Sequence, residues 1–444
     1  MTTKSIPFLG ITPHISNIFQ VTCPGSKSIT NRALLLATLA EGTSTLRGVL
    51  FSEDSRHFLK CIQDLGFETT VNEEAKIITI KGLGGAIPKE EASIYVGSAG
   101  TAARFLTAFL GLSKGTWHLD ASPQMKRRPM APLLDALKAL GCTVQYEGQE
   151  GFFPFTLISP GFTSYKATVN IDKSSQFLSA LMIAAVLSPE DFMITLEGSH
   201  GMAYVEMTQK MMEEFGVTLF MEPWKDSYRI LVPAGQSLTA LDYQIEPDIS
   251  GACYFYGAAA LTGLSVQVKD VHLNALQGDA QFLTLLKTMG CSLKEEEDGV
   301  ILTGPENGIL KGVTVDMSTY SDQAITLAAL ASFADSPTTI TGIGHIRLQE
   351  SDRIHAIVTE LTKLGIQCQE GSDCITIFPG QPKPNSIDTY EDHRVAMGFS
   401  LIGLRTEGIV INDPECCKKT FETYFQVLDK FAKDVNTFPK FNRP

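Results

Sequence analysis

Charged residues, cysteines and long apolar runs are all scarce in this 444-residue sequence. Only 19% of the residues are charged and 44% are hydrophobic, a balance that excludes an intrinsically disordered or collagen-like chain. An apolar run such as Leu178 to Leu187 falls far short of the roughly 18 residues that a membrane-spanning helix needs. Residues 1–10 carry no recognisable targeting signal. We therefore predict a folded, cytoplasmic protein with no membrane partner.

The nine cysteines include no C-x-x-C pair, although Cys416 and Cys417 are adjacent. An odd number of thiols in apolar segments indicates reduced side chains that pack as small hydrophobic groups. A redox or metal role for the adjacent pair is the less favoured interpretation, so we predict no metal site. The 36 Lys and Arg against 49 Asp and Glu give a net charge of −13, the wrong sign for binding nucleic acid. Any anionic ligand must therefore meet a local cluster of cations.

One sequence phrase recurs along the chain: an amphipathic helix, an apolar residue, a glycine and a short strand pair. Its glycines, spaced by 75, 75, 74 and 75 residues, are Gly66, Gly141, Gly216, Gly290 and Gly365. Glycine readily adopts the left-handed conformation that ends a helix, so we expect each of them to do so.

A second series of positions lies about half a repeat out of phase, each just before an almost wholly apolar helix. Its members are Ser28, Thr101, Ser175, Ser250, Asp322 and Arg394. Helices that are apolar on every face must be buried, whereas the glycine-ended helices are polar on one face and should cover the outside. The sequence therefore predicts six βαβαββ repeats of about 74 residues, in two halves that part near Pro247.

The start of each apolar helix offers unpaired N–H groups and a partial positive charge, which attract anions. At the first start, Ser28 and Arg32 share one helix face and Lys27 lies at its mouth, so a phosphate would be accommodated there. A P-loop is excluded, because that motif needs glycine where this chain has Ser26 and Val21.

The other helix starts carry further donors, cations and carboxylates. They comprise residues 97–101 with Arg104, 126–128, 174–176, Asp322, 349–353, 391–394 and 418–419. Taken singly, these segments are explained by ordinary helix caps, solvated charge runs and salt bridges. Taken together, they favour an active site between the two halves that holds a pair of multiply charged anions.

These residues resemble the EPSP synthase family of enolpyruvyl transferases. The resemblance keeps the family's order along nearly the whole chain, in PGSKSITNRALLLA, GSAGTAARF, MKRRPM, SSQFLSAL, SDQA, ESDRI, YEDHRVAM and KKTF. It implies a two-domain inverted α/β barrel with three βαβαββ repeats in each domain, in agreement with the two series. One domain is expected to comprise residues 25–246 and the other residues 1–24 and 247–444, with the active site in the cleft between them.

The resemblance implies transfer of the enolpyruvyl group of phosphoenolpyruvate to the 5-hydroxyl of shikimate 3-phosphate, without metal or organic cofactor. Two anionic substrates must be held together against their repulsion, which requires many fixed cations. The residues implied for phosphoenolpyruvate are Lys27, Gly100, Arg128, Gln176, Arg353, Arg394 and Lys419. Those implied for shikimate 3-phosphate are Lys27, Ser28, Arg32, Ser174, Ser175, Gln176, Tyr204, Asp322 and Gln349. The family also implies a monomer that closes on its first substrate.

Three residues are expected to move protons. Glu350 is our choice for the proton on the methylene carbon. Asp322 is expected to face the ring hydroxyls of shikimate 3-phosphate and act as a base. Lys27 is expected to serve as a shared acid and base. These roles are hypotheses.

Several positions depart from the family pattern. Gln349 replaces a usual Lys, Ser98 and His345 replace Asn, and Gly201 replaces Ser near the phosphate. Gly100 is retained, which in the family accompanies sensitivity to glyphosate.

Two other functions stay open on the sequence. The sister transferase that acts on UDP-N-acetylglucosamine has Asn after its Lys, where this chain has Ser28, and its loop cysteine has no convincing counterpart here. A non-catalytic, anion-binding relative is conceivable from the departures. The joint retention of Lys27, Asp322 and Glu350 argues against it, because a mere binding protein has no use for them.

Overall fold

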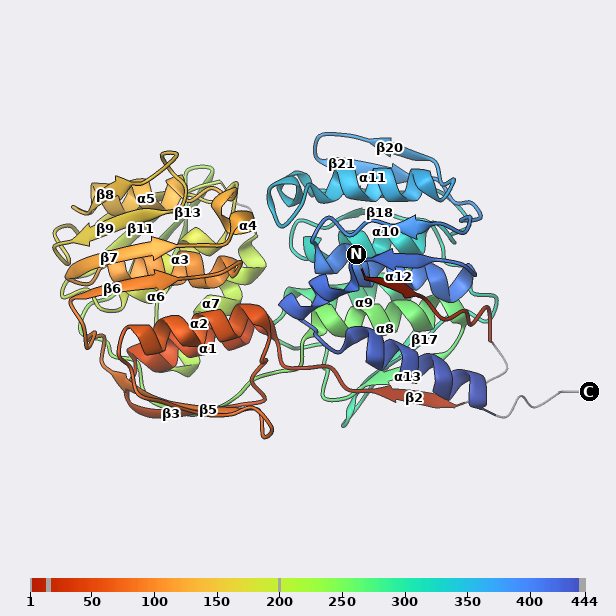
Figure 1. The fold of residues 1–444 in the computed structure, drawn as a ribbon, viewed down its shortest axis with the longest axis horizontal. Coiled ribbons are helices and arrows are strands. Elements are labelled where there is room, and N and C mark those ends of the chain that lie inside the picture. The colour runs from red at the N-terminus through yellow and green to blue at the C-terminus, as the bar shows by residue number, and fades with distance from the viewer. Residues whose placement is uncertain (1, 13–16, 199–200, 439–444) are drawn as a thin grey trace, which may run out of the picture. The chain divides into compact units, whose positions relative to one another are not determined.

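The computed structural model describes residues 2–12, 17–198 and 201–438 of the chain (Figure 1). The chain divides into two compact units. We call residues Gly25–Ile245 the central unit, and Met1–Pro24 together with Glu246–Pro444 the terminal unit. Among the described residues, no helix combines the length and the apolar composition that crossing a membrane requires.

The central unit pairs buried inner helices with amphipathic outer helices. The inner helices are α1 (Lys27–Leu39), α3 (Gly100–Gly111) and α6 (Gln176–Ala185), and the outer ones are α2 (Glu53–Asp64), α5 (Ala131–Ala139) and α7 (Met202–Glu214), with a single turn α4 (Pro123–Lys126) before α5. The strands are β3 (Glu41–Arg47), β4 (Thr69–Asn72), β5 (Ile77–Leu83), β6 (Glu91–Tyr95), β7 (Gly115–Asp120), β8 (Thr143–Tyr146), β9 (Phe155–Ser159), β10 (Lys166–Asn170), β11 (Phe192–Glu197), β12 (Phe220–Trp224), β13 (Ser227–Val232) and β14 (Asp242–Gln244).

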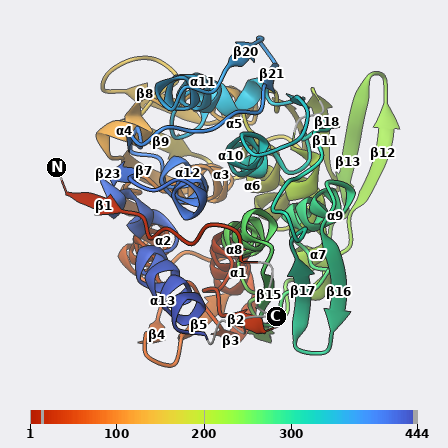
Figure 2. The same ribbon diagram turned by 90° about the vertical axis from the view of Figure 1, so that its right-hand side faces the viewer.

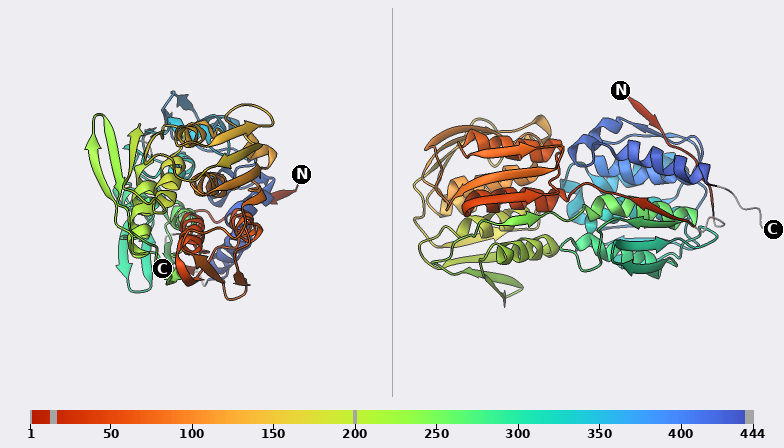
Figure 3. Two further views of the ribbon diagram at one scale, coloured as in Figure 1. Left: turned by 90° about the vertical axis from the view of Figure 1, so that its left-hand side faces the viewer. Right: turned by 90° about the horizontal axis from the view of Figure 1, so that it is seen from below.

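The sheets of the central unit share one topology, a parallel pair followed by two antiparallel strands. Their orders are β6-β7-β9-β8, β10-β11-β13-β12 and β14-β3-β5-β4. In the last of them β14, from the end of the unit, runs parallel to β3 and aligns Asp242 with Thr45. The first repeat therefore takes its leading strand from the far end of the unit. Figure 3 shows the central unit in orange-red to yellow-green.

The terminal unit repeats this design. Its inner helices are α8 (Ile249–Thr262), α10 (Ala324–Ala331) and α12 (His393–Arg405), and its outer ones are α9 (Gln281–Thr288), α11 (Arg353–Lys363) and α13 (Tyr424–Thr437). The strands are β1 (Thr3–Ser5), β2 (Ile18–Val21), β15 (Ser265–Val268), β16 (Ser292–Glu296), β17 (Gly299–Thr303), β18 (Thr314–Asp316), β19 (Thr338–Thr341), β20 (Cys368–Glu370), β21 (Cys374–Ile377), β22 (Ser386–Ile387) and β23 (Val410–Asn412). Two of its sheets have the orders β16-β17-β15-β2 and β18-β19-β21-β20.

The sixth repeat departs from the predicted βαβαββ pattern. Its sheet is three-stranded in the order β1-β23-β22, with β22 parallel to β23 and β1 antiparallel to it. The N-terminal strand takes the place that a hairpin fills in the other repeats, because the chain after β23 continues into the amphipathic helix α13. The α/β fold of repeated inner and outer helices is nevertheless confirmed.

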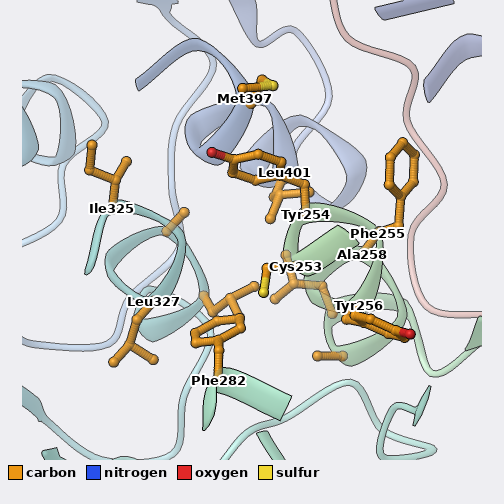
Figure 4. Packing of buried hydrophobic residues seen from close by; sticks show 14 of the residues in the cluster. Cys253, Tyr254, Phe255, Tyr256, Ala258, Phe282, Ile325, Leu327, Met397 and Leu401 are labelled. Carbon is orange, nitrogen blue, oxygen red and sulfur yellow. The ribbon is translucent and has the colours of Figure 1, made fainter. Parts of the chain in front are cut away.

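The core of the terminal unit lies among its inner helices, which pack against one another (Figure 2). Every residue of α8 is buried, and so is every residue of α10. Figure 4 shows Cys253, Phe255, Leu327 and Leu401 within this cluster. The crossing of α8 and α12 is close, since a Cβ atom on Gly257 would lie 2.8 Å from Cδ1 of Leu401. Helices without a polar face are thus buried, as predicted.

The five repeated glycines each follow the last turn of an outer helix. Their φ angles are 96° at Gly66, 101° at Gly141, 89° at Gly216, 112° at Gly290 and 81° at Gly365. All lie in the left-handed region that glycine adopts without steric cost. The prediction that these residues end the outer helices is confirmed.

Candidate active site

Most of the predicted helix-start residues lie where the sequence placed them. Lys27, Gly100 and Gln176 begin α1, α3 and α6, Arg394 is the second residue of α12, and Arg353 begins the outer helix α11. Asp322 differs, because it lies in a 3-10 turn (Ser321–Gln323) just before α10 and not in the helix itself. The functional side chains fall into two clusters, one in each unit.

In the central unit, the guanidinium of Arg32 is buried among neutral acceptors. Its Nε donates to Oγ1 of Thr208 at 2.8 Å, and its Nη1 and Nη2 donate to the carbonyl oxygens of Ser28 at 3.0 Å and Tyr204 at 3.2 Å. Its guanidinium carbon lies 5.3 Å from the ring centre of Phe105. Burial lowers the pKa of Arg32 from 12.5 to about 10. Among the described residues no carboxylate pairs with it, so an incoming phosphate would supply the missing negative charge.

The predicted serines Ser174 and Ser175 lie at the start of α6. The Ser174 hydroxyl accepts a hydrogen bond from the amide N–H of Gln176 at 3.3 Å and so caps the start of α6. Ser175 is buried, and a Cβ atom on Gly201 would lie 2.7 Å from its Oγ. Gly201 has a φ of 69°, so it suits both the left-handed backbone and the close approach at the position where the family has Ser.

Gly100 lies beside three side chains, two from its own repeat and one from the next. A Cβ atom placed on it would lie 2.6 Å from Nη1 of Arg104, 2.9 Å from Nη1 of Arg128 and 3.2 Å from Oε1 of Gln176. Arg104 also donates to Gln176 Oε1 and to the Gly100 carbonyl oxygen, both at 3.3 Å. Arg104 was identified from the sequence but not assigned to a ligand. Its spacing of four residues from Gly100 is the signal that places it here.

Lys27 is held at the start of α1 by a carboxylate that was not predicted from the sequence. Its Nζ lies 3.5 Å from Oδ2 of Asp54, which is almost fully buried near the start of α2. Ser98, one of the departures from the family pattern, donates to Oδ1 of Asp54 at 3.3 Å. Asp54 looked like an ordinary acidic residue in the first turn of a helix, and only the fold brings it to Lys27.

In the terminal unit, Arg353 is the centre of the second cluster. Its Nε donates to Oδ2 of Asp392 at 2.8 Å, its Nη1 to Oδ1 of Asp322 at 2.9 Å, and its Nη2 to Oε2 of Glu350 at 2.9 Å. Nη1 also donates to Oε1 of Gln349, the residue that replaces a family lysine. Burial disfavours the charged form, but Asp392, Glu350 and Asp322 outweigh it and raise the pKa of Arg353.

Two more predicted cations complete this cluster. The Nη2 of Arg394 donates to Oδ2 of Asp322 at 2.7 Å, and the Nζ of Lys419 lies 3.6 Å from Oε1 of Glu350. Asp322 thus bridges Arg353 and Arg394, and Glu350 bridges Arg353 and Lys419. The carboxylates at the centre are therefore held in fixed positions by cations that can also receive an anionic ligand.

Asp392 is the residue of this cluster that sequence reasoning left unassigned. It is fully buried as the N-cap of α12, and its Oδ2 accepts from Ser351 at 2.9 Å as well as from Arg353. His345, another departure from the family pattern, lies on the cluster's flank with its Nε2 2.7 Å from Oγ of Ser321. The motif around Asp392 was visible in the sequence, but its partner on α11 was not.

Asp279 lies close behind this cluster in the terminal unit and carries an unusual pKa. Burial and the charge of Asp322 raise that pKa from 3.8 to about 7, against the opposing effects of Arg394 and a hydrogen bond from Ser250. In the described ranges, no group of three or more His, Cys, Asp and Glu side chains is arranged to hold a metal ion.

The sequence is similar to one protein family along most of its length. The model of the family described as EPSP synthase (3-phosphoshikimate 1-carboxyvinyltransferase) matches residues 18–428. The 3-phosphoshikimate 1-carboxyvinyltransferase of Nostoc punctiforme is 44% identical over 406 residues, covering 91% of this chain and 94% of that protein. The 3-phosphoshikimate 1-carboxyvinyltransferase 2 of Halalkalibacterium halodurans is 39% identical over 423 residues, covering 94% and 92%.

Solved structures give a similar result. A structure of the EPSP synthase from Acinetobacter baumannii matches with a TM-score of 0.76 at 26% sequence identity. The match covers 96% of this chain and 97% of that chain. Sequence and fold therefore point to one family along almost the whole chain.

Proposed function

The chain belongs to the EPSP synthase family, and on that basis we propose that its two clusters together form the active site of the family's reaction. The enzyme transfers the enolpyruvyl group of phosphoenolpyruvate to the 5-hydroxyl of shikimate 3-phosphate. The products are 5-enolpyruvylshikimate 3-phosphate and phosphate, in the shikimate pathway to the aromatic amino acids. The observation that carries the assignment is the family match over residues 18–428, joined with cation clusters at the predicted helix starts.

The central unit is proposed to hold the phosphate of shikimate 3-phosphate. Arg32 is a buried cation surrounded by neutral acceptors. The protein has already desolvated its guanidinium on folding, so a phosphate would gain a charge-assisted hydrogen bond without that further cost. The hydroxyls and amide proposed to assist it are those of Ser28, Ser174, Ser175, Tyr204 and Gln176. Lys27, Asp322 and Gln349 are proposed to contact the ring hydroxyls.

Phosphoenolpyruvate is proposed to bind through cations of both clusters. Arg128 lies beside the Gly100 backbone and Gln176, where the absence of a side chain on Gly100 lets these donors approach the backbone closely. Lys27, Arg353, Arg394 and Lys419 supply further charge. Phosphate and carboxylate groups suit planar guanidinium donors, which bind them in a bidentate manner.

The chemistry divides into an addition and an elimination. The 5-hydroxyl oxygen attacks the central carbon of phosphoenolpyruvate and loses its proton to Asp322 or Lys27, while Glu350 protonates the methylene carbon. The tetrahedral intermediate then loses phosphate as its carbon–oxygen bond breaks. The base that took the hydroxyl proton returns it to the departing phosphate oxygen, and Glu350 takes back a proton from the methyl group. Atoms and charge balance without a redox step or a cofactor.

The ion pairs around Glu350 suggest how it could serve as an acid. Nη2 of Arg353 lies 2.9 Å from its Oε2, and Nζ of Lys419 lies 3.6 Å from its Oε1. An anionic substrate would take up both cations and add negative charge nearby, which favours uptake of a proton by Glu350. Substrate binding would thereby prepare the acid for the addition step.

A phosphate-release assay tests the proposed function. We expect phosphate release with phosphoenolpyruvate and shikimate 3-phosphate, unchanged by a metal chelator, and none when UDP-N-acetylglucosamine replaces shikimate 3-phosphate. Release only with the nucleotide sugar would identify the sister transferase. No release with either acceptor, together with binding of the anions, would identify a non-catalytic relative.

The retention of Gly100 supports inhibition by glyphosate, a small anion that bears a phosphonate and a carboxylate. We expect glyphosate to compete with phosphoenolpyruvate in the assay above.

The protein is further proposed to act in the cytoplasm as a monomer, without a nucleic acid partner. The net charge of −13 argues against a nucleic acid partner, and the nine cysteines, all present as free thiols, suit a reducing compartment.

A further inference from the structure

The turn that leads into α12 has a backbone that its residues do not favour. The N–H of Asp392 donates to the carbonyl oxygen of Thr389 at 2.8 Å, which closes a four-residue turn. The two central residues, Tyr390 and Glu391, have φ angles of 56° and 57°. Turns with two consecutive left-handed residues normally use Gly, Asn or Asp, because other side chains collide with the backbone there. The protein therefore maintains a strained turn directly before the second cluster.

A buried carboxylate on α11 holds this turn in place. The Tyr390 hydroxyl donates to Oε1 of Glu360 at 2.6 Å, and the backbone N–H of Asp388 donates to Oε2 of Glu360 at 3.1 Å. Glu360 is fully buried, and the Nζ of Lys363 lies 2.8 Å from its Oε2. Lys363 also binds Oδ2 of Asp388 at 2.9 Å. The segment from Asp388 to Tyr390 is thus anchored at both its ends to one carboxylate.

The strained turn sets the position of Asp392, on which the second cluster depends. Oδ1 of Asp392 accepts the backbone N–H of Arg394 at 3.0 Å, and its Oδ2 accepts Nε of Arg353 at 2.8 Å. A relaxed turn would move Asp392, so Arg353 would lose a side-chain partner and the first turn of α12, which carries Arg394, would lose its cap. Strain at such a point is maintained only where the surrounding structure fixes it, and it gathers at functional sites.

We propose that Glu360 and Tyr390 are positioning residues that hold the strained turn at 389–392 and thereby align Arg353 and Arg394 for phosphoenolpyruvate. This inference rests on the proposed function. Neither residue contacts the reacting atoms in this account, and both act through Asp392. Burial and the hydrogen bond to Glu360 raise the pKa of Tyr390, so its hydroxyl remains a donor throughout the working pH range.

Two substitutions of Tyr390 separate anchoring from strain. Tyr390→Phe keeps the ring, removes the hydroxyl and leaves the strained conformation unfavourable. Tyr390→Asn also removes the hydroxyl, but Asn tolerates the left-handed conformation. We expect Tyr390→Phe to raise the KM for phosphoenolpyruvate about tenfold or more, the scale on which loss of a charge-assisted hydrogen bond acts. Tyr390→Asn should raise it less, and kcat should change less than KM in both.

Hydrogen exchange gives a readout that does not depend on activity. The amide of Asp392 closes the turn, so we expect faster exchange in the 389–394 segment of Tyr390→Phe than in Tyr390→Asn. Tyr228→Phe, on strand β13 of the central unit, serves as the matched control and should leave both readouts unchanged. A merely structural role for the ring predicts the opposite order, with greater damage in Tyr390→Asn.

The results that overturn the inference are equal losses in the two variants, a larger loss in Tyr390→Asn, or a wild-type KM in Tyr390→Phe. If the wild-type protein releases no phosphate, the proposed function fails, and the order of exchange rates still decides the inference. Both substitutions are expected to fold, because 36% of the Tyr390 residue is exposed to solvent.

Discussion

Single residues of the candidate site show two ways of keeping a cation inside a protein. Arg353 is surrounded by carboxylates, whereas Arg32 is surrounded by hydroxyl and carbonyl oxygens. Burial therefore lowers the pKa of Arg32, while the neighbouring carboxylates raise that of Arg353. We propose that Arg32 binds the phosphate of a substrate and that Arg353 fixes the carboxylates that move protons.

Glu350 is the residue whose loss should affect chemistry most and binding least. We expect Glu350→Gln to lower kcat by about 10²- to 10⁴-fold, the usual contribution of a general acid or base, with KM values within a few-fold of wild type. Glu370→Gln is the matched control, because Glu370 pairs with Arg347 on the surface of the same unit at 2.7 Å. Steady-state kinetics of both variants check this, and a near-normal kcat in Glu350→Gln would remove it from the mechanism.

The raised pKa of Asp279 predicts a dependence of stability on pH. The folded-state pKa of about 7 exceeds the unfolded value near 3.9, so stability is fully present below about pH 4 and is lost as the pH rises through 7. We expect Asp279→Asn to raise the free energy of unfolding relative to wild type by about 1–3 kcal/mol more at pH 8 than at pH 5.

Urea denaturation at the two pH values measures this difference. Asp316→Asn is the control, because hydrogen bonds from Ser318 lower the pKa of Asp316, so its titration is complete below pH 5 and its effect should be the same at both pH values. The same gain for Asp279→Asn at pH 5 and pH 8 would contradict the assignment of a raised pKa to Asp279.

A site residue could be predicted only where the local sequence pattern around it is distinctive. Lys27, Arg32 and Arg394 stand at the starts of apolar helices, and that pattern is visible in the sequence. Asp54 and Asp392 resemble ordinary first-turn or capping carboxylates, and their partners come from distant segments. Only the fold brings such pairs together, so no local pattern could identify them.

Among the secondary-structure elements, the outer helices provide the clearest test of a sequence rule. Gly290 has a φ of 112° and open space around it, since no atom lies within 4 Å of an added Cβ. Gly141 has a φ of 101°, but there an added Cβ would overlap Thr163. We expect Gly290→Ala to lower the free energy of unfolding by about 1–2 kcal/mol, the cost of the left-handed conformation, and Gly141→Ala to lower it further.

Chemical denaturation of the two glycine variants measures both effects. Strain alone is present at Gly290, and strain with overlap is present at Gly141. Equal losses would mean that Thr163 moves aside without cost, and no loss at Gly290 would mean that the left-handed conformation is not what makes glycine necessary there.

Strand exchange between repeats is the element-level feature that the sequence did not disclose. The helix periodicities and glycine spacings predicted the repeats, since each helix extends over several turns. Strands such as β1 and β14 have three residues each, too few to carry a pattern that identifies a partner. The family resemblance placed residues 1–24 with residues 247–444, but the pairing of β1 with β23 in the sixth repeat appeared only in the structure.

At the scale of the whole molecule, the central unit is continuous in sequence and has its own core. We expect a fragment of residues 25–245 to fold with a cooperative thermal transition, because β14 closes the first sheet against β3 within these residues. A fragment that ends at residue 237 lacks β14 and should melt at a lower temperature. Circular dichroism of the two fragments tests this, and an unfolded 25–245 fragment would contradict the independence of its core.

The central claim is that cations of both units serve a single reaction. A crystal structure of the complete protein with shikimate 3-phosphate and an unreactive analogue of phosphoenolpyruvate tests it most directly. Our account predicts that Arg32 holds the shikimate phosphate, and that Arg128 of the central unit and Arg353 or Lys419 of the terminal unit contact the same analogue molecule. Ligands that touch residues of one unit only would contradict it.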